Sequence, residues 1–292
     1  FIPAAYSRTF NTFLAGLYVM GTGLALLQTA ANPYVTFLGP QERAAQRISI
    51  MGVCNKTAGA LAPLVLAYFI LSDGNNFLES LNSLTGTEPY TNALDDLALR
   101  VVKPYLVMTF LLFCLGLYVR FSPLPDIKVA DPKDQENLEE KKSVFDFPHL
   151  ILGAFALFFY MGLEVIAGDT IIQYGLYNGM GINFAKKLTS YTMLAMILGY
   201  LSGILLIPKF VNQRLLLIFS AFLGMFFSLI IVMTSGWVSV VFVVLLGFSN
   251  AIVWPAIWPL ALRNLGTFIN QGSAILIMSI SGGALIPLFW GK

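Results

Sequence analysis

The sequence predicts an all-α protein that crosses a lipid bilayer several times. Of its 292 residues, 57% are hydrophobic and only 11% are charged, and the mean hydropathy is +0.77. Soluble domains carry about 25% charged residues, so this excess of apolar surface needs lipid as its solvent. The apolar residues also fall in runs of about 20, the length that a helix needs to cross about 30 Å of hydrocarbon.

Eight such runs qualify as membrane-spanning segments. They cover residues 10–38, 48–72, 102–121, 150–177, 188–207, 215–234, 237–262 and 272–291. Only Ser235 and Gly236 separate the sixth segment from the seventh. The polar stretch 122–149, rich in proline and charge, reads as a linker.

Two short stretches inside these segments are nearly identical. Residues 59–64 read Gly-Ala-Leu-Ala-Pro-Leu, and residues 283–288 read Gly-Ala-Leu-Ile-Pro-Leu. A repeat with a six-helix period is typical of transporters built from two similar halves. We therefore expect residues 1–121 to be the last three helices of one half, 122–149 a cytoplasmic linker, and 150–292 the first five helices of the other half. As such a fragment, residues 1–292 alone are not expected to transport; a true eight-span protein is the alternative.

Charge gives the orientation, because lysine and arginine concentrate in cytoplasmic loops. Ten of them fall in one set of loops and five in the other, which places residues 1 and 292 on the outer side. The net charge of +2 gives no reason to expect a nucleic-acid partner.

No pattern of catalytic residues appears. His149 is the only histidine, Cys54 and Cys114 lie in different segments without a CxxC pattern, and there is no Ser-His-Asp set, phosphate loop or metal-ligand cluster. We expect no enzyme, no catalytic or metal-binding residue and no cofactor.

Polar residues inside a span are costly, so they usually face a cavity or a partner. By segment they are Gln28 and Asn32; Asn55 and Lys56; Glu164, Asp169 and Gln173; and Asn250, with Trp254 and Trp258 following it at intervals of four. Residues four apart share a helical face.

This inventory suits a sugar. Amides both donate and accept hydrogen bonds, as hydroxyls do, and an aromatic ring can pack on the apolar face of a pyranose. The expected substrate-binding residues are Gln28, Asn32, Asn55, Gln173, Asn250 and Trp254. The expected coupling residues are Glu164, Asp169 and Lys56. Asp169 is expected to be the main cation-binding acid, and Lys56 to take the place of the cation when the site empties.

Each of these groups has a structural alternative. The amides can form helix–helix hydrogen bonds, and the charged residues can form a structural ion pair. The tryptophans fit an interfacial aromatic belt, Trp258 better than Trp254 because it lies nearer the cytoplasmic end.

Two motifs of the sequence resemble those of a known protein family. The run Gln28-Thr-Ala-Ala-Asn-Pro33-Tyr-Val-Thr-Phe-Leu-Gly39-Pro40, followed by Arg47 and Asn55, resembles the fourth and fifth helices of the fucose permease and glucose/galactose transporter family of the major facilitator superfamily. Cys54-Asn-Lys56-Thr-Ala-Gly59 resembles the glucose/galactose branch. The resemblance implies the major facilitator fold with eight of its twelve helices present, the fourth to the eleventh, in a bacterial inner (plasma) membrane.

The sequence departs from this family at three positions. The fucose permease has a glutamate where Gln28 stands and a glutamine where Gly52 stands, and the family's Gly-Arg-x-x-x-Gly pattern reads Gly199-Tyr200-Leu-Ser-Gly203 here. Gln28 can bond a hydroxyl but cannot take a proton. The resemblance therefore carries over no proton relay, and Glu164, Asp169 or Lys56 would replace it.

The expected function is a cation-coupled sugar symporter that imports a hexose such as glucose, galactose or fucose. We expect a monomer in the bilayer, with sodium or a proton as the coupling ion. A facilitator of another small polar solute is one alternative. A transporter of a drug or lipid would instead need a more apolar cavity, with fewer amides than Gln28, Asn32, Asn250 and Gln271 provide. A sugar-binding membrane sensor is another, but the linker 122–149 is too short for a signalling domain.

Overall fold

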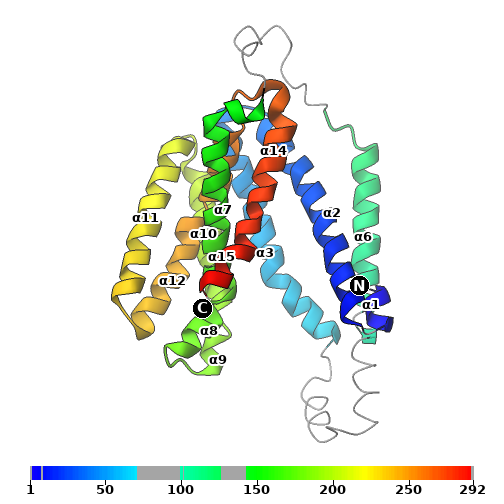
Figure 1. Cartoon of the computed structure of the whole chain (residues 1–292), viewed down its shortest axis with the longest axis vertical. Coiled ribbons are helices and arrows are strands. Elements are labelled where there is room, and N and C mark those ends of the chain that lie inside the picture. Colours follow the sequence, from blue (N-terminus) through cyan, green and yellow to red (C-terminus); the bar gives the residue numbers. More distant parts are fainter. Residues whose placement is uncertain (1, 8, 71–98, 101, 126–142, 291–292) are drawn as a thin grey trace, which may run out of the picture. The chain divides into compact units, whose positions relative to one another are not determined.

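The structure is a computed structural model that describes residues 2–7, 9–70, 99–100, 102–125 and 143–290, and every regular element among them is helical (Figure 1). Contacts group the chain into two compact units. One comprises residues 1–26 and 59–126, and the other comprises residues 27–58 and 127–292. The predicted domain boundaries at residues 121 and 149 stay predictions.

The first unit is built from parts of four helices. It contains α1 (Ile2–Ser7), which contacts α6 (Val102–Phe121), together with the first part of α2 (Phe10–Phe37) and the last part of α3 (Ala44–Ile70). Phe110 and Phe113 on α6 are more than 60% exposed. Such a surface is stable in lipid rather than in water.

The second unit holds the end of α2, the start of α3 and the remaining helices. These are α7 (Pro148–Asp169), α8 (Ile171–Tyr177), α9 (Ile182–Ala185), α10 (Leu188–Leu206), α11 (Gln213–Met233), α12 (Gly236–Asn250), α13 (Val253–Ala261), α14 (Ile269–Met278) and α15 (Gly282–Trp290). Helix α7 packs against α10, α12, α13 and α15, and α12 packs against α10 and α11. The core around α7 contains the fully buried side chains of Leu150, Leu157, Trp258 and Leu276.

Seven helices of the described part are long and apolar enough to span a membrane. They cover residues 10–37, 102–121, 148–169, 182–206, 213–233, 236–261 and 266–289, close to seven of the predicted segments. The remaining segment, 48–72, corresponds up to residue 70 to α3, which is not among the seven. Helix α3 has 27 residues, about 40 Å at 1.5 Å per residue, which is long enough to cross about 30 Å of hydrocarbon.

Three predicted segments are interrupted where the sequence suggested continuous helices. The segment 150–177 divides at Thr170 into α7 and α8, and 237–262 divides at residues 251–252 into α12 and α13. The segment 272–291 passes through a 3₁₀ turn (Ser279–Ser281) between α14 and α15. The second break lies four residues before Pro255. A proline has no N–H for the carbonyl at i−4 and clashes with it, so the helix cannot continue regularly past Ala251.

Glycines set the close packing of α10. A Cβ added at Gly199 would lie 2.5 Å from the Phe248 carbonyl oxygen, and one at Gly203 would lie 2.5 Å from Ile252 Cδ1. Only glycine allows such an approach, which is the usual meaning of a small-xxx-small pattern in membrane helices. These contacts, with Phe248 on α12 and with Ile252 just after α12, fix the height and rotation of α10, and hence the position of Tyr200.

Candidate functional site

The end of α2 brings two amides to one place. Gln28 and Asn32 are four residues apart and therefore share a helical face. Asn32 is only 4% exposed. Among the described residues, Gln28 Oε1 and Asn32 Nδ2 are buried and have no hydrogen-bond partner. An unmade hydrogen bond at a buried polar atom costs free energy, so these two atoms mark a place where a ligand can bond.

Arg47 holds this part of α2 against α3. Its Nε donates to the Val35 carbonyl (2.9 Å), its Nη2 to the Thr36 carbonyl (2.6 Å) and its Nη1 to the Pro40 carbonyl (2.9 Å). The last carbonyls of a helix have no partner within the helix, and Arg47 supplies one. The ends of α2 and α3 that carry the site are thereby fixed to each other.

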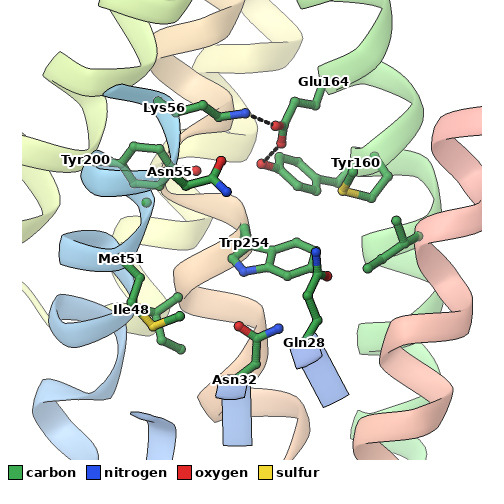
Figure 2. Close-up of a pocket in the computed structure, with 13 residues that line it drawn as sticks. Gln28, Asn32, Ile48, Met51, Asn55, Lys56, Tyr160, Glu164, Tyr200 and Trp254 are labelled. Atoms are coloured by element: carbon green, nitrogen blue, oxygen red, sulfur yellow. Dashed lines mark hydrogen bonds and ion pairs between the residues drawn. The ribbon is translucent and has the colours of Figure 1, made fainter. Parts of the chain in front are cut away.

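Helix α3 presents one continuous face to the same place. Ile48, Met51, Gly52, Asn55 and Lys56 follow the spacing of a single helical stripe. They line a cavity of about 210 Å³ within the second unit (Figure 2). The other lining residues are Gln28 and Asn32 from α2, Tyr160, Met161 and Glu164 from α7, Tyr200 from α10, Trp254 from α13, and Ile280.

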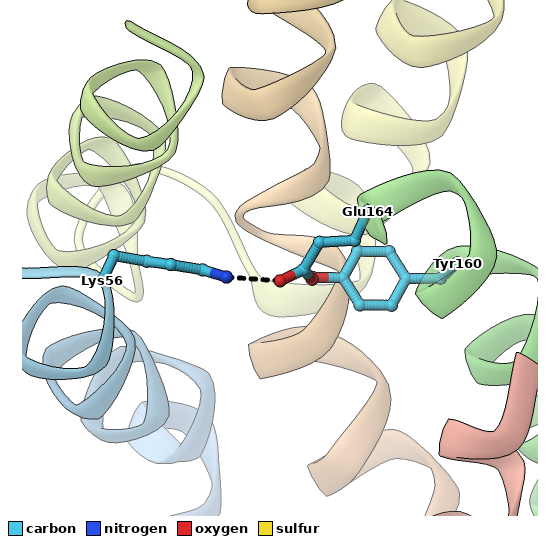
Figure 3. Close-up of polar contacts among 3 residues, drawn as sticks. All are labelled: Lys56, Tyr160 and Glu164. Carbon is cyan, nitrogen blue, oxygen red and sulfur yellow. Dashed lines mark hydrogen bonds and ion pairs between the residues drawn. The ribbon is translucent and has the colours of Figure 1, made fainter. Parts of the chain in front are cut away.

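A charged group occupies one end of the cavity. Lys56 Nζ donates to Glu164 Oε1, and the Tyr160 hydroxyl donates to Glu164 Oε2 (Figure 3). Glu164 and Tyr160 share a face of α7 because they are four residues apart. Lys56 and Glu164 are the charged residues of the lining, and their charges cancel. The cavity is therefore polar without a net charge.

Trp254 lies between this charged group and the two amides (Figure 2). It follows the break before α13, and its ring contacts Trp258 with centroids 5.6 Å apart. The alternative of an interfacial aromatic belt does not fit Trp258, because its side chain is fully buried in the core around α7.

Three of the residues predicted to line the site lie elsewhere. Asp169 at the end of α7 and Gln173 on α8 are exposed and do not line the cavity. Asn250 is buried at the end of α12, with its Nδ2 lacking a partner among the described residues, and it does not line the cavity either. The helix breaks at Thr170 and at residues 251–252 separate Asp169 from Gln173 and Asn250 from Trp254, so the members of each pair do not share one helical face as expected.

Two tyrosines of the cavity were not predicted. Tyr160 could have been found from its i, i+4 spacing to Glu164. Tyr200 appeared in the sequence only as a departure from a family pattern, and nothing in its local sequence indicates that its ring reaches α3.

The lining can bind an uncharged molecule that carries both hydroxyls and an apolar face. Amides at one end and a Lys–Glu–Tyr group at the other offer donors and acceptors, and the Trp254 ring offers a flat apolar surface. Within the described residues no three His, Cys, Asp or Glu side chains gather in a way that could hold a metal ion.

Comparisons with known proteins identify the family of the chain. The sequence model described as Major Facilitator Superfamily matches residues 1–288. A glucose/galactose transporter of Brucella abortus is 33% identical over 296 residues, covering 100% of this chain and 67% of the relative. A putative glucose/galactose transporter of Helicobacter pylori is 30% identical (100% and 68% covered), and the L-fucose-proton symporter of Escherichia coli is 26% identical (100% and 67% covered).

A solved structure is similar as well. The major facilitator transporter FucP, crystallised in the outward conformation, superposes with a TM-score of 0.85 at 26% identity, covering 100% of this chain and 71% of that one. These relatives are bacterial transporters and not enzymes, as expected. With the membrane-spanning helices above, they identify a multi-pass protein of the bacterial inner membrane. The chain belongs to the major facilitator superfamily.

Proposed function

We propose that this chain is part of a sugar transporter that moves a neutral hexose across the membrane by alternating access. The observation that carries the proposal is the pair of unpartnered amide atoms, Gln28 Oε1 and Asn32 Nδ2, beside the ring of Trp254. One is an acceptor and the other a donor, and a sugar hydroxyl both donates and accepts. The names of the relatives, glucose/galactose transporter and L-fucose-proton symporter, support the same class of substrate.

The charged residues that line the cavity narrow the class of sugar that it can bind. Because Lys56 and Glu164 neutralise each other, a charged sugar would bring an uncompensated charge into the site, and burial of an unpaired charge is costly. A neutral hexose such as glucose, galactose or fucose is therefore favoured over a hexuronate.

Uptake into vesicles that carry the full-length protein tests the proposal. Labelled D-glucose, D-galactose and L-fucose are compared with labelled D-glucuronate. We expect saturable uptake of at least one neutral hexose, inhibited by the unlabelled sugar, and no uptake of glucuronate. Uptake of glucuronate alone, or of none of the four sugars, contradicts the proposal.

We further propose that transport is coupled to a cation through Glu164. Among the described residues that line the cavity, Glu164 is the one with a carboxylate. Both of its carboxylate oxygens accept hydrogen bonds, one from Lys56 and one from Tyr160. A proton on Glu164 would release Lys56, whereas a sodium ion there would meet an ammonium group. This arrangement favours a proton over sodium.

A facilitator is the second candidate, favoured by the same ion pair. If Lys56 stays bonded to Glu164 throughout the cycle, no site for a coupling ion remains at this acid. Accumulation of sugar above the outside concentration under an imposed proton gradient supports the symporter. Equilibration without accumulation under proton and sodium gradients alike supports the facilitator.

A further inference from the structure

The side chain of Tyr200 reaches from α10 onto the backbone of α3. A Cβ built on Gly52 would lie 2.5 Å from Tyr200 Cε1, 2.6 Å from Cζ and 2.7 Å from Cδ1. Real Cβ atoms do not approach other atoms so closely, so the ring rests directly on the glycine. Only the absence of a side chain at residue 52 leaves room for it.

The ring cannot move away easily. Tyr200 is 3% exposed and belongs to a buried cluster with Met196 and Ala251. Close-packed interiors offer few voids into which a ring can shift. The close contacts of α10, at Gly199 with Phe248 and at Gly203 with Ile252, also fix the helix that carries the ring.

Tyr200 lines the cavity, and so does the residue it rests on. Gly52 precedes Asn55 by three residues and Lys56 by four, so these side chains share the cavity face of α3. With Tyr160 on α7 and Trp254 on α13, Tyr200 gives the cavity a third aromatic residue, each from a different helix (Figure 2).

We propose that Tyr200 is a sugar-contacting, specificity-determining residue, and that Gly52 holds its ring in place by lacking a side chain. The ring offers an apolar surface to the hexose, while Gln28 and Asn32 bond its hydroxyls. This inference rests on the proposed function and adds a residue pair to its site.

A double-mutant cycle tests the proposal. Binding of D-glucose, D-galactose and L-fucose to the purified full-length protein is measured by titration calorimetry for Tyr200→Leu, Gly52→Ala and the two combined. Tyr200→Leu should weaken binding of the preferred sugar about three- to tenfold and change the order of preference among the three, because an aromatic contact is lost. Tyr200→Phe, which keeps the ring, should stay within about twofold.

Gly52→Ala should weaken binding to a similar extent in the presence of Tyr200, although alanine favours a helix more than glycine does. In the Tyr200→Leu background the same alanine should have little further effect, because the clash is gone. Gly224→Ala is the matched control, since its added Cβ would lie 3.4 Å from Ser249 Oγ, an ordinary contact outside the cavity.

The outcomes separate the two proposals. If the wild type binds a hexose and Tyr200→Leu binds it equally well, the role of Tyr200 is contradicted but the proposed function is not. The same holds if the effects of Tyr200→Leu and Gly52→Ala are additive. A wild-type protein that binds none of the three sugars contradicts the proposed function and the sugar contact together.

Discussion

Gln28 is the residue at which sugar binding can be tested with least risk to the fold. Its Oε1 has no partner among the described residues, so Gln28→Ala removes no protein contact of that atom. Loss of one hydrogen bond, worth about 0.5–1.5 kcal/mol, should weaken hexose binding about two- to tenfold. Titration calorimetry measures this, with Gln271→Ala as the control, because Gln271 is an exposed amide outside the cavity. Equal affinity in wild type and Gln28→Ala would remove Gln28 from the site.

Glu164 and Asp169 can be separated by the kind of transport they support. The sequence favoured Asp169 as the coupling acid, but Asp169 is exposed outside the cavity while Glu164 bonds Lys56 inside it. We therefore expect Glu164→Gln to abolish gradient-driven accumulation of hexose while sparing exchange of labelled for unlabelled sugar, which needs no net ion movement. Asp169→Asn should leave both intact. The reverse pattern would return the coupling role to Asp169.

Single helices are held in place by contacts that can be removed one at a time. The clearest such contact is the clamp formed by Arg47 on the end of α2. Two hydrogen bonds from its guanidinium to the Val35 and Thr36 carbonyls join α3 to α2, and a third reaches the Pro40 carbonyl in the connecting segment. Arg47→Gln should lower the free energy of unfolding by about 1.5–3 kcal/mol, the value of hydrogen bonds from a charged group. Thermal unfolding of the detergent-solubilised protein measures the loss. Arg43→Gln, on the exposed side of the same turn, should change stability little; equal losses in both variants contradict the clamp.

The contact of α7 with the start of α15 is closest at Gly282. A Cβ at Gly282 would lie 1.9 Å from the Phe158 carbonyl oxygen, which is backbone and cannot rotate away. Gly282→Ala should therefore push the two helices apart and cost about 1–3 kcal/mol or more, as overpacking does. Gly168→Ala is the control, since its Cβ would lie 3.9 Å from Met193 Cε. If both variants unfold at the wild-type temperature, this close approach does not exist in the protein.

For the whole molecule, the sequence predicts what depends on local pattern. Hydropathy located seven helices that are long and apolar enough to span the membrane, and the spacing of Gln28 and Asn32 correctly placed both amides on one face. It failed where a helix ends unexpectedly. Gln173 was assigned to the face of Asp169, but α7 ends at Asp169 and α8 begins only at Ile171, after the break at Thr170.

Contacts between distant segments were beyond the sequence for a different reason. Lys56 and Glu164 are 108 residues apart, and no local pattern pairs them. Gly52 and Tyr200 each appeared only as a departure from a family pattern, and the structure shows that the two departures touch. Such pairs are set by how α3, α7 and α10 pack together, which depends on side chains along their whole length.

The central claim is that a neutral hexose binds in the cavity between the amides of α2 and Trp254. Protection of an introduced cysteine tests it most directly. Met51→Cys lies in the cavity lining and Gln173→Cys lies outside it, each in a Cys54→Ser, Cys114→Ser background, since both native cysteines are free and exposed. We expect saturating D-glucose or D-galactose to slow maleimide labelling of Met51→Cys and to leave labelling of Gln173→Cys unchanged. Protection of Gln173→Cys with unaltered labelling of Met51→Cys would contradict the account.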